Sequence, residues 1–343
     1  MLPTRTHKLR WILGISLGAI CGLILRLLIT FHRPDHRPRL SSDADAVMTI
    51  GFLFIAPFAV GFITIYVMQR DQQCNWWQRI FVPWMAILIS TGVTSLLVLE
   101  GAICILLSLP ITLTCSSLGG VLAGVIYKVL PRFRHTPAAC LAVLPLILAP
   151  VEAGRTQPTQ IRSVNTDIVI HASPSVVWRN IERVPLIRPE ELRPNWTHRI
   201  GFPRPLEATL SHEGVGGVRH ATFEHGVLFV ETITDWEPEK LLAFSIRADA
   251  ADIPPGTLDD HVKVGGRYFD VFRGEYRLEP RGHGDVVLHL SSQERLTTDF
   301  NFYSGFWSDA IMRNLQESIL QVIKKRCEAE SPTPPAKPAP AER

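Results

Sequence analysis

Three long runs without a charged residue dominate the first half of the chain. They lie at about residues 47–67, 80–99 and 102–127. A helix needs about 20 apolar residues to cross about 30 Å of hydrocarbon, because every backbone amide must be satisfied internally once water is excluded. Each run reaches that length, so the pattern predicts transmembrane helices rather than parts of a soluble core.

Two further segments belong to the same half. A span is predicted at about residues 11–31, where Arg26 interrupts the apolar run; we expect its side chain to extend to the lipid headgroups, with Glu100 as an alternative intramembrane partner. Residues 138–151 are apolar but short and contain two prolines, so they form either a fifth span or an interfacial segment. We favour a crossing.

The distribution of basic residues predicts the orientation of these spans. Lys and Arg before the first span, after the second and after the fourth number eight, against three after the first. Because basic loops stay on the cytoplasmic side, we expect a cytoplasmic amino terminus in a multi-pass protein of the plasma or inner membrane. The side on which the rest of the chain lies depends on whether residues 138–151 cross.

The composition changes after Val151, where charges and turn residues recur every few positions. We therefore divide the chain into a transmembrane region at residues 1–152, a soluble domain at 160–328 and a disordered proline-rich tail at 329–343. The net charge of +3 includes no basic run interleaved with aromatics, which argues against nucleic acid as a partner.

Cysteine and histidine spacing gives no sign of a metal or cofactor. Of the six cysteines only Cys327 lies in the soluble half, which excludes a disulfide within that domain. Neither a CxxC nor an HExxH pattern occurs, so the usual zinc signatures are missing. We predict no cofactor and no metal.

The soluble half alternates short strands with turns and ends in a long helix. Strands are predicted at about residues 167–171, 206–211, 218–224, 227–236, 241–247, 268–278 and 286–296. Ser173 and Pro174 begin a helix after the first strand, and a long loop is expected at 248–266. The closing helix, 303–326, has an apolar face at every fourth residue, formed by Trp307, Ile311, Leu315, Ile319 and Ile323.

This succession of elements resembles the helix-grip fold of the SRPBCC superfamily, which includes START and polyketide cyclase-like domains. Asp167 to Trp178 resembles the opening strand and the A-x-P-x-x-V-W helix start, and Val227 to Pro238 resembles the central strand with its W-x-P turn. The resemblance covers about residues 164–327. It implies an α+β domain with an antiparallel sheet curved around the long helix, and an apolar cavity between them.

Strand parity predicts which side chains face that helix. We expect a three-residue hairpin loop at residues 225–227 with its glycine in the left-handed region. In this register Phe223 lies opposite Phe229, and Arg219 and Glu231 lie on the same face as both. A two-residue loop, the alternative, would separate the two phenylalanines.

Arg219 and Glu231 are the candidate polar groups of the cavity. They form either a structural ion pair between two strands or a polar anchor for a ligand, with apolar contacts from Phe223, Phe229 and Trp307. Glu231 is a candidate acid-base group if burial outweighs its pairing with Arg219. We assign no other catalytic residue.

Three functions are compatible with this pattern. The resemblance implies a membrane-anchored domain that binds a hydrophobic small molecule or lipid, with the bilayer as a partner. The second is a cyclase- or hydrolase-type enzyme that uses the same cavity. The third is a structural or regulatory membrane subunit that meets a protein partner.

Overall fold

The computed structural model describes residues 5–31, 48–69, 73–97, 102–129, 143–148, 152, 155–249 and 264–331. The chain divides into two compact units, one of amino-terminal helices and one built on a sheet. Most of the loop predicted at residues 248–266 and most of the proline-rich tail lie outside the described residues. Residues 143–148 of the disputed fifth segment are helical, and the rest of that segment also lies outside.

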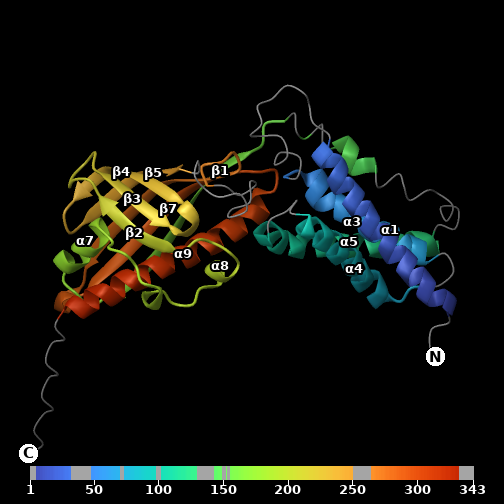
Figure 1. The fold of residues 1–343 in the computed structure, drawn as a ribbon, viewed down its shortest axis with the longest axis horizontal. Helices are drawn as coiled ribbons and strands as arrows, with labels where there is room; N and C mark the ends of the chain where they lie inside the picture. Colours follow the sequence, from blue (N-terminus) through green and yellow to red (C-terminus); the bar gives the residue numbers. More distant parts are fainter. Residues whose placement is uncertain are drawn as a thin grey trace, which may run out of the picture. The chain divides into compact units, whose positions relative to one another are not determined.

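Apolar helices make up the first unit (Figure 1). They are α1 (Arg5–Phe31), the π-helical turn η1 (Gly51–Ile55) continuing into α3 (Ala56–Met68), α4 (Trp76–Leu96) and α5 (Ala102–Val129). Within the described residues, four stretches are long and apolar enough to cross a membrane: Leu9–Leu28, Gly51–Met68, Trp76–Leu96 and Ile103–Val129. α4 begins four residues before the predicted span, because the Gln78 side chain accepts a hydrogen bond from the Asn75 N–H and caps a polar first turn.

Glycines bring these helices into close contact. A Cβ atom on Gly119 would lie 2.0 Å from the carbonyl oxygen of Phe58 in α3, and one on Gly61 would lie 1.9 Å from the carbonyl oxygen of Ser116. Gly124 packs in the same way against the side chain of Arg79 in α4. Backbones can approach this closely only where side chains are missing.

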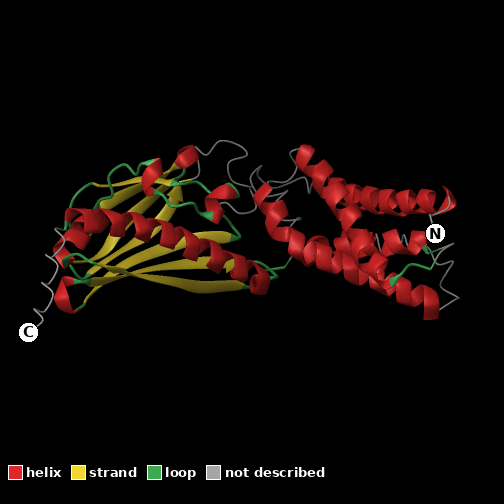
Figure 2. Cartoon of the chain, turned by 90° about the horizontal axis from the view of Figure 1, so that it is seen from below, coloured by secondary structure: helices red, strands yellow, loops and turns green. Residues whose placement is uncertain are grey.

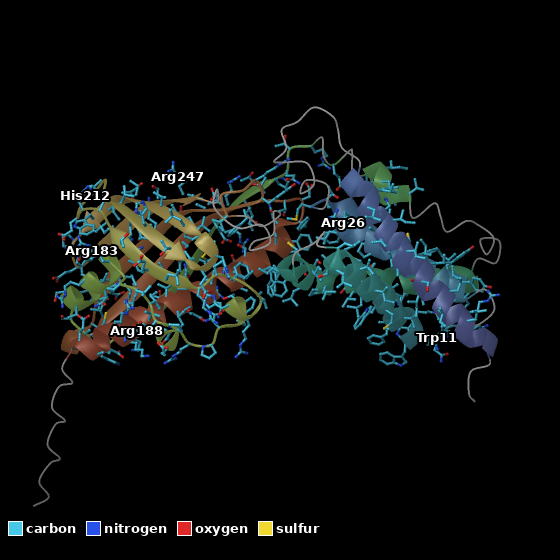
Figure 3. All side chains as sticks on the ribbon, in the orientation of Figure 1. Trp11, Arg26, Arg183, Arg188, His212 and Arg247 are labelled. Carbon is cyan, nitrogen blue, oxygen red and sulfur yellow. The ribbon has the colours of Figure 1, made fainter. Side chains whose placement is uncertain are left out.

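Trp11 and Arg26 lie near opposite ends of α1 (Figure 3). Only 5% of Arg26 is exposed, so its side chain lies among the packed helices instead of extending from their outer surface as expected. Glu100, the alternative partner, lies outside the described residues.

The second unit is a seven-stranded antiparallel sheet with strand order β1-β7-β6-β5-β4-β3-β2. Each predicted strand is present, with shifted ends. The strands are β1 (Thr159–Ile170), β2 (Pro205–Leu210), β3 (Val218–Phe223), β4 (Leu228–Glu237), β5 (Leu241–Asp249), β6 (Phe269–Pro280) and β7 (Val286–Thr297).

β1 starts eight residues earlier than predicted because its first half is polar yet paired. The Arg162 side chain binds Asp309, and the Thr166 hydroxyl donates to Gln316 at 2.7 Å, both on the closing helix. A search for alternating apolar residues cannot detect such a segment.

Helix α9 (Asn301–Glu330) crosses one face of the sheet (Figure 2). The helix predicted after β1 is α7 (Pro174–Glu182), and a short helix α8 (Trp196–Arg199) precedes β2. The main core lies between the sheet, α7 and the second half of α9, and includes Ile170, Trp178, Leu242, Leu288 and Ile323. This is a helix-grip architecture, an antiparallel sheet closed by a carboxy-terminal helix.

The buried side of α9 differs in part from the predicted stripe. Ile323 is buried, but Trp307, Ile311 and Leu315 keep part of their surface exposed. Gln316 is buried because its amide donates to the Val164 carbonyl and to Ser292. Polar groups that satisfy one another can occupy a core-facing position that apolar periodicity does not indicate.

Candidate ligand-binding site

The β3–β4 hairpin sets the register of the predicted site residues. Its loop is Glu224–Gly226, one residue earlier than predicted, and both His225 (φ 61°) and Gly226 (φ 76°) are left-handed. Arg219 therefore lies directly opposite Glu231, and Ala221 lies opposite Phe229. The predicted pairing of Phe223 with Phe229 is wrong by two residues, since Phe229 pairs with Ala221. The shared face is retained, because the shift moves each residue by two.

Arg219 and Glu231 form an ion pair that is almost completely buried. The guanidinium donates to Glu231 Oε2, and the two residues are 4% and 5% exposed. The Arg219 guanidinium also lies 5.6 Å from the ring centroid of Phe244, which adds a cation–π contact. Burial raises the pKa of the Glu231 carboxyl, while Arg219 opposes that rise.

Of the three apolar candidates, Phe223 and Phe229 lie on the same two strands as the ion pair, and Trp307 lies near the start of α9. The rings of Phe223 and Phe229 are 5.0 Å apart, diagonally across the two strands. Trp307 lies in the first two turns of α9, against Phe306 at 5.4 Å. All three candidates are half-buried.

Glu294 is a second buried carboxyl that the sequence did not single out. It is 0% exposed, and the Ser308 hydroxyl donates to its Oε1 atom. Burial raises the pKa of Glu294, with Ser308 acting in the opposite direction. The alternation in β7 could have indicated its burial, because Leu288, Leu290 and Leu296 point inward and residue 294 lies on the same side. The polar run Ser291 to Arg295 instead reads as a solvated strand.

Strand pairing puts Glu294 level with the ion pair. Arg219 is opposite Glu231, and Glu231 is opposite Ile246 on β5. The same row continues across β6 near its bulge at Val271, whose partner is Glu294 on β7. Three strand spacings of about 4.8 Å separate β4 from β7, so the backbones of Glu231 and Glu294 lie about 14 Å apart along the sheet.

Several buried polar atoms of the sheet and α9 have no hydrogen-bond partner. Among the described side chains of the sheet and α9, the buried atoms without a hydrogen bond are Arg219 Nε, Glu294 Oε2, Trp307 Nε1 and Ser318 Oγ. A buried polar group without a partner costs about 1–3 kcal/mol, so each such atom calls for an explanation.

The two ends of the sheet differ in how tightly they are filled. Toward α7, Ile170, Leu242 and Leu288 are completely buried. At the level of Glu231, the inward-facing Phe229 and Ile246 keep exposed surface. These two side chains are therefore less completely covered than the core residues beside α7.

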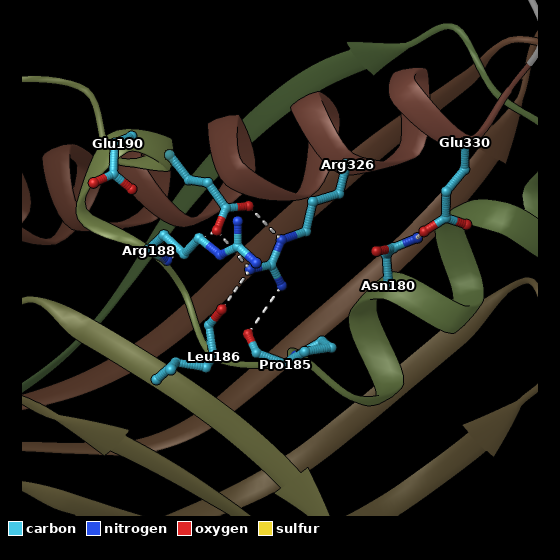
Figure 4. A pocket seen from close by; sticks show the side chains of 8 residues that line it. Asn180, Pro185, Leu186, Arg188, Glu190, Arg326 and Glu330 are labelled. Carbon is cyan, nitrogen blue, oxygen red and sulfur yellow. Dashed lines mark hydrogen bonds and ion pairs between the residues drawn. The ribbon is translucent and has the colours of Figure 1, made fainter.

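A separate groove of about 760 Å³ opens beside the last turns of α9 (Figure 4). The Arg326 guanidinium crosses it and donates to both carboxylate oxygens of Glu191, at 2.7 and 3.0 Å, and to the carbonyls of Pro185 and Leu186. None of the predicted site residues lines this groove. All three nitrogens of the Arg326 guanidinium already donate hydrogen bonds within the protein.

No protein-family model and no curated protein matches the chain. Solved structures with similar folds include an uncharacterized Rhizobium leguminosarum protein, which is 12% identical over 51% of this chain and 100% of its own, with a TM-score of 0.32. Norcoclaurine synthase from Thalictrum flavum is 14% identical over 51% of this chain and 91% of its own (TM-score 0.32).

An aromatase/cyclase from Streptomyces sp. R1128 is 14% identical over 49% of this chain and 94% of its own, with a TM-score of 0.31. Similarities of this size assign neither a family nor an activity to the chain.

Proposed function

We propose that this protein is anchored in a membrane by its apolar helices and binds a hydrophobic small molecule or lipid between the sheet and α9. Partial exposure of the inward-facing Phe229 and Ile246, beside buried polar atoms without partners, is the observation that carries the proposal. Ligand sites in proteins combine apolar walls with a few placed polar groups.

The proposed site consists of an apolar wall and an ion pair. Phe223, Phe229 and Trp307 would contact the apolar body of the ligand. Arg219 would orient a polar end, since one of its nitrogens is engaged by Glu231 while Nε has no partner. A membrane next to such a site would supply apolar ligands at high local concentration.

Native mass spectrometry of the full chain, gently extracted in lipid nanodiscs, tests the proposal. We expect a copurified apolar molecule, and we expect Ile246→Trp to remove it by filling the space beside Glu231. Ser245→Trp is the matched control, because Ser245 is the exposed neighbour on the opposite face of β5. Ligand retained equally in both variants, or absent from the wild type, would contradict the proposal.

An enzyme acting in the same place is the second candidate, favoured by the raised pKa of Glu231. A carboxyl with a raised pKa keeps its proton to a higher pH than usual and can transfer it to a bound substrate. Glu231→Gln separates the two functions. Binding would survive this change, whereas turnover by a Glu231-dependent enzyme would fall by about 100-fold or more.

A structural or regulatory membrane subunit is the third candidate. It would need no ligand, and its soluble domain would meet a protein partner. A wild-type chain that carries no apolar molecule from its native membrane, but copurifies with a stoichiometric protein, would favour it.

The membrane half of the proposal includes its domain limits and its orientation. We place the transmembrane region at residues 1–152 and the ligand-binding domain at 160–328, in a plasma or inner membrane with the amino terminus in the cytoplasm. Resistance to carbonate extraction of the membrane fraction is the expected result. Release of the full chain by carbonate would contradict membrane insertion.

A further inference from the structure

Two of the four unpartnered buried atoms of the sheet and α9 can only donate a hydrogen bond. Arg219 Nε and Trp307 Nε1 each carry one hydrogen and cannot accept, whereas Ser318 Oγ can do either. Glu294 Oε2 is the fourth atom, and its role depends on whether the carboxyl holds a proton. The protonation state of Glu294 therefore decides what the interior offers a ligand.

The surroundings of Glu294 favour the neutral acid. Arg162 on β1 is the nearby cation, but Asp309 on α9 engages it through both carboxylate oxygens, one at 2.9 Å from Arg162 Nε. Contact with Gly305 fixes this arginine further, since a Cβ there would lie 2.9 Å from the guanidinium carbon. A carboxylate that is completely buried without its own cation is strongly disfavoured, and it takes up a proton instead.

The other elements around Glu294 supply no counter-charge. Its partner across the strands, Val271 on β6, is apolar. The neighbouring charges on those strands, Arg295 and Asp270, lie 3.8 Å from each other. Ser308 donates its only hydrogen to Oε1. Oε2 is left as the atom that carries the acid proton.

We infer that neutral Glu294 donates a hydrogen bond from Oε2 to the ligand and that, together with the N–H of Trp307, it selects apolar molecules bearing an acceptor oxygen such as a ketone. Ser308 forms the hydrogen bond to Glu294, and Trp307 is the residue before it in α9. The Glu294 carboxyl and the Trp307 N–H therefore both lie at the amino-terminal end of α9. This inference rests on the proposed function, because it names the class of ligand for the same site.

Two isosteric probes test the selection. 2-Acetylnaphthalene carries a ketone, and 2-isopropenylnaphthalene has the same shape with a methylene group in place of the acceptor oxygen. We expect the full chain in nanodiscs to bind the ketone about tenfold more tightly, since an unmet buried donor costs about 1.4 kcal/mol or more. Equilibrium dialysis, corrected for uptake by empty nanodiscs, measures both affinities.

Three variants assign the preference to Glu294. Glu294→Leu removes the donor and should reduce the ketone preference several-fold, whereas Glu294→Gln keeps an N–H donor and should retain it. Gln293→Leu, on the adjacent position facing the other way, should leave it unchanged. With rising pH the wild type should lose the preference as Glu294 ionises, while Glu294→Gln should not. Thermal unfolding of each variant verifies that it is folded.

The outcomes separate the inference from the proposed function. If neither probe binds the wild type, binding of apolar ligands at this site is itself refuted. If both bind and Glu294→Leu keeps the full preference, only the role of Glu294 is refuted. Tighter binding of 1-(2-naphthyl)ethylamine than of the ketone at neutral pH would mean that Glu294 is ionised, and would overturn the inference.

Discussion

The ion pair between Arg219 and Glu231 is almost completely shielded from water, so removing either residue leaves the other buried without its counter-charge. Arg219→Met should lower the free energy of unfolding by about 3–5 kcal/mol, because it leaves a buried carboxyl without its cation. The double variant Arg219→Met, Glu231→Leu should recover most of that loss. Thermal or denaturant unfolding in a mild detergent gives the comparison. If the double variant were as unstable as Arg219→Met alone, the unpaired carboxyl of Glu231 would not be the cause of the lost stability.

A second prediction at this scale concerns Glu191. The hydrogen bond from Arg326 lowers the pKa of Glu191 to about 2, below its ordinary value near 4.5. A lowered folded pKa stabilises the protein above pH 4.5, and that stabilisation is lost as the pH falls toward 2. The melting-temperature difference between wild type and Glu191→Gln should therefore shrink over this window. Glu190→Gln, an exposed neighbour, should show no such trend.

Single residues also show where sequence reasoning reached its limit in the site. Arg219 and Glu231 were selected correctly as neighbours, because apolar side chains on both strands indicated which face was inward. Glu294 was missed, since it stands in a polar run and its environment comes from the next helix, α9, and from β1, which is far away in sequence. Its burial depends on Ser308, Asp309 and Arg162, which belong to other elements and therefore cannot be inferred from the residue pattern of β7.

At the scale of elements, close helix packing gives a matched pair of glycine substitutions. Gly61→Ala should destabilise the helical unit, because the added Cβ would lie 1.9 Å from the Ser116 carbonyl. Gly92→Ala should have little effect or stabilise slightly, because nothing lies within 4 Å of the added atom. Fluorescence-detected size-exclusion chromatography after heating measures both. Equal loss in the two variants would argue against the packing of α3 on α5.

The β3–β4 hairpin explains why element positions were easier to predict than register. Alternation identified both strands within a residue or two. The loop moved by one position because His225 adopts a left-handed conformation beside Gly226. Such a conformation is uncommon for a residue with a side chain, and no composition rule identifies it at a particular histidine. The shared face was still predicted correctly, because facing depends on parity.

For the whole molecule, the proposed topology leads to a labelling prediction. If residues 138–151 cross, the soluble domain and the amino terminus lie on opposite sides of the membrane. The exposed Arg247→Cys should then react with a membrane-impermeant maleimide in intact cells. Buried Cys327 should not react in the folded protein, so a Cys327-only background is suitable. Labelling of Arg247→Cys only after permeabilisation would place the domain in the cytoplasm.

The division of the chain into an apolar half and a sheet half was the most accessible feature of the sequence. Length and charge sufficed for the four apolar helices, and turn residues sufficed for most strands. The first half of β1 was not found, because an edge strand that pairs through polar groups lacks the apolar alternation on which such predictions rely.

The sheet order has a consequence for how the protein is made. β1 and β7 are neighbours, so the first strand to leave the ribosome pairs with the last. The domain cannot close while it is being synthesised, and its first strand must wait, with an open edge, until nearly the whole chain has been translated. Pairing across so long a separation is slow and leaves the nascent chain open to misassembly.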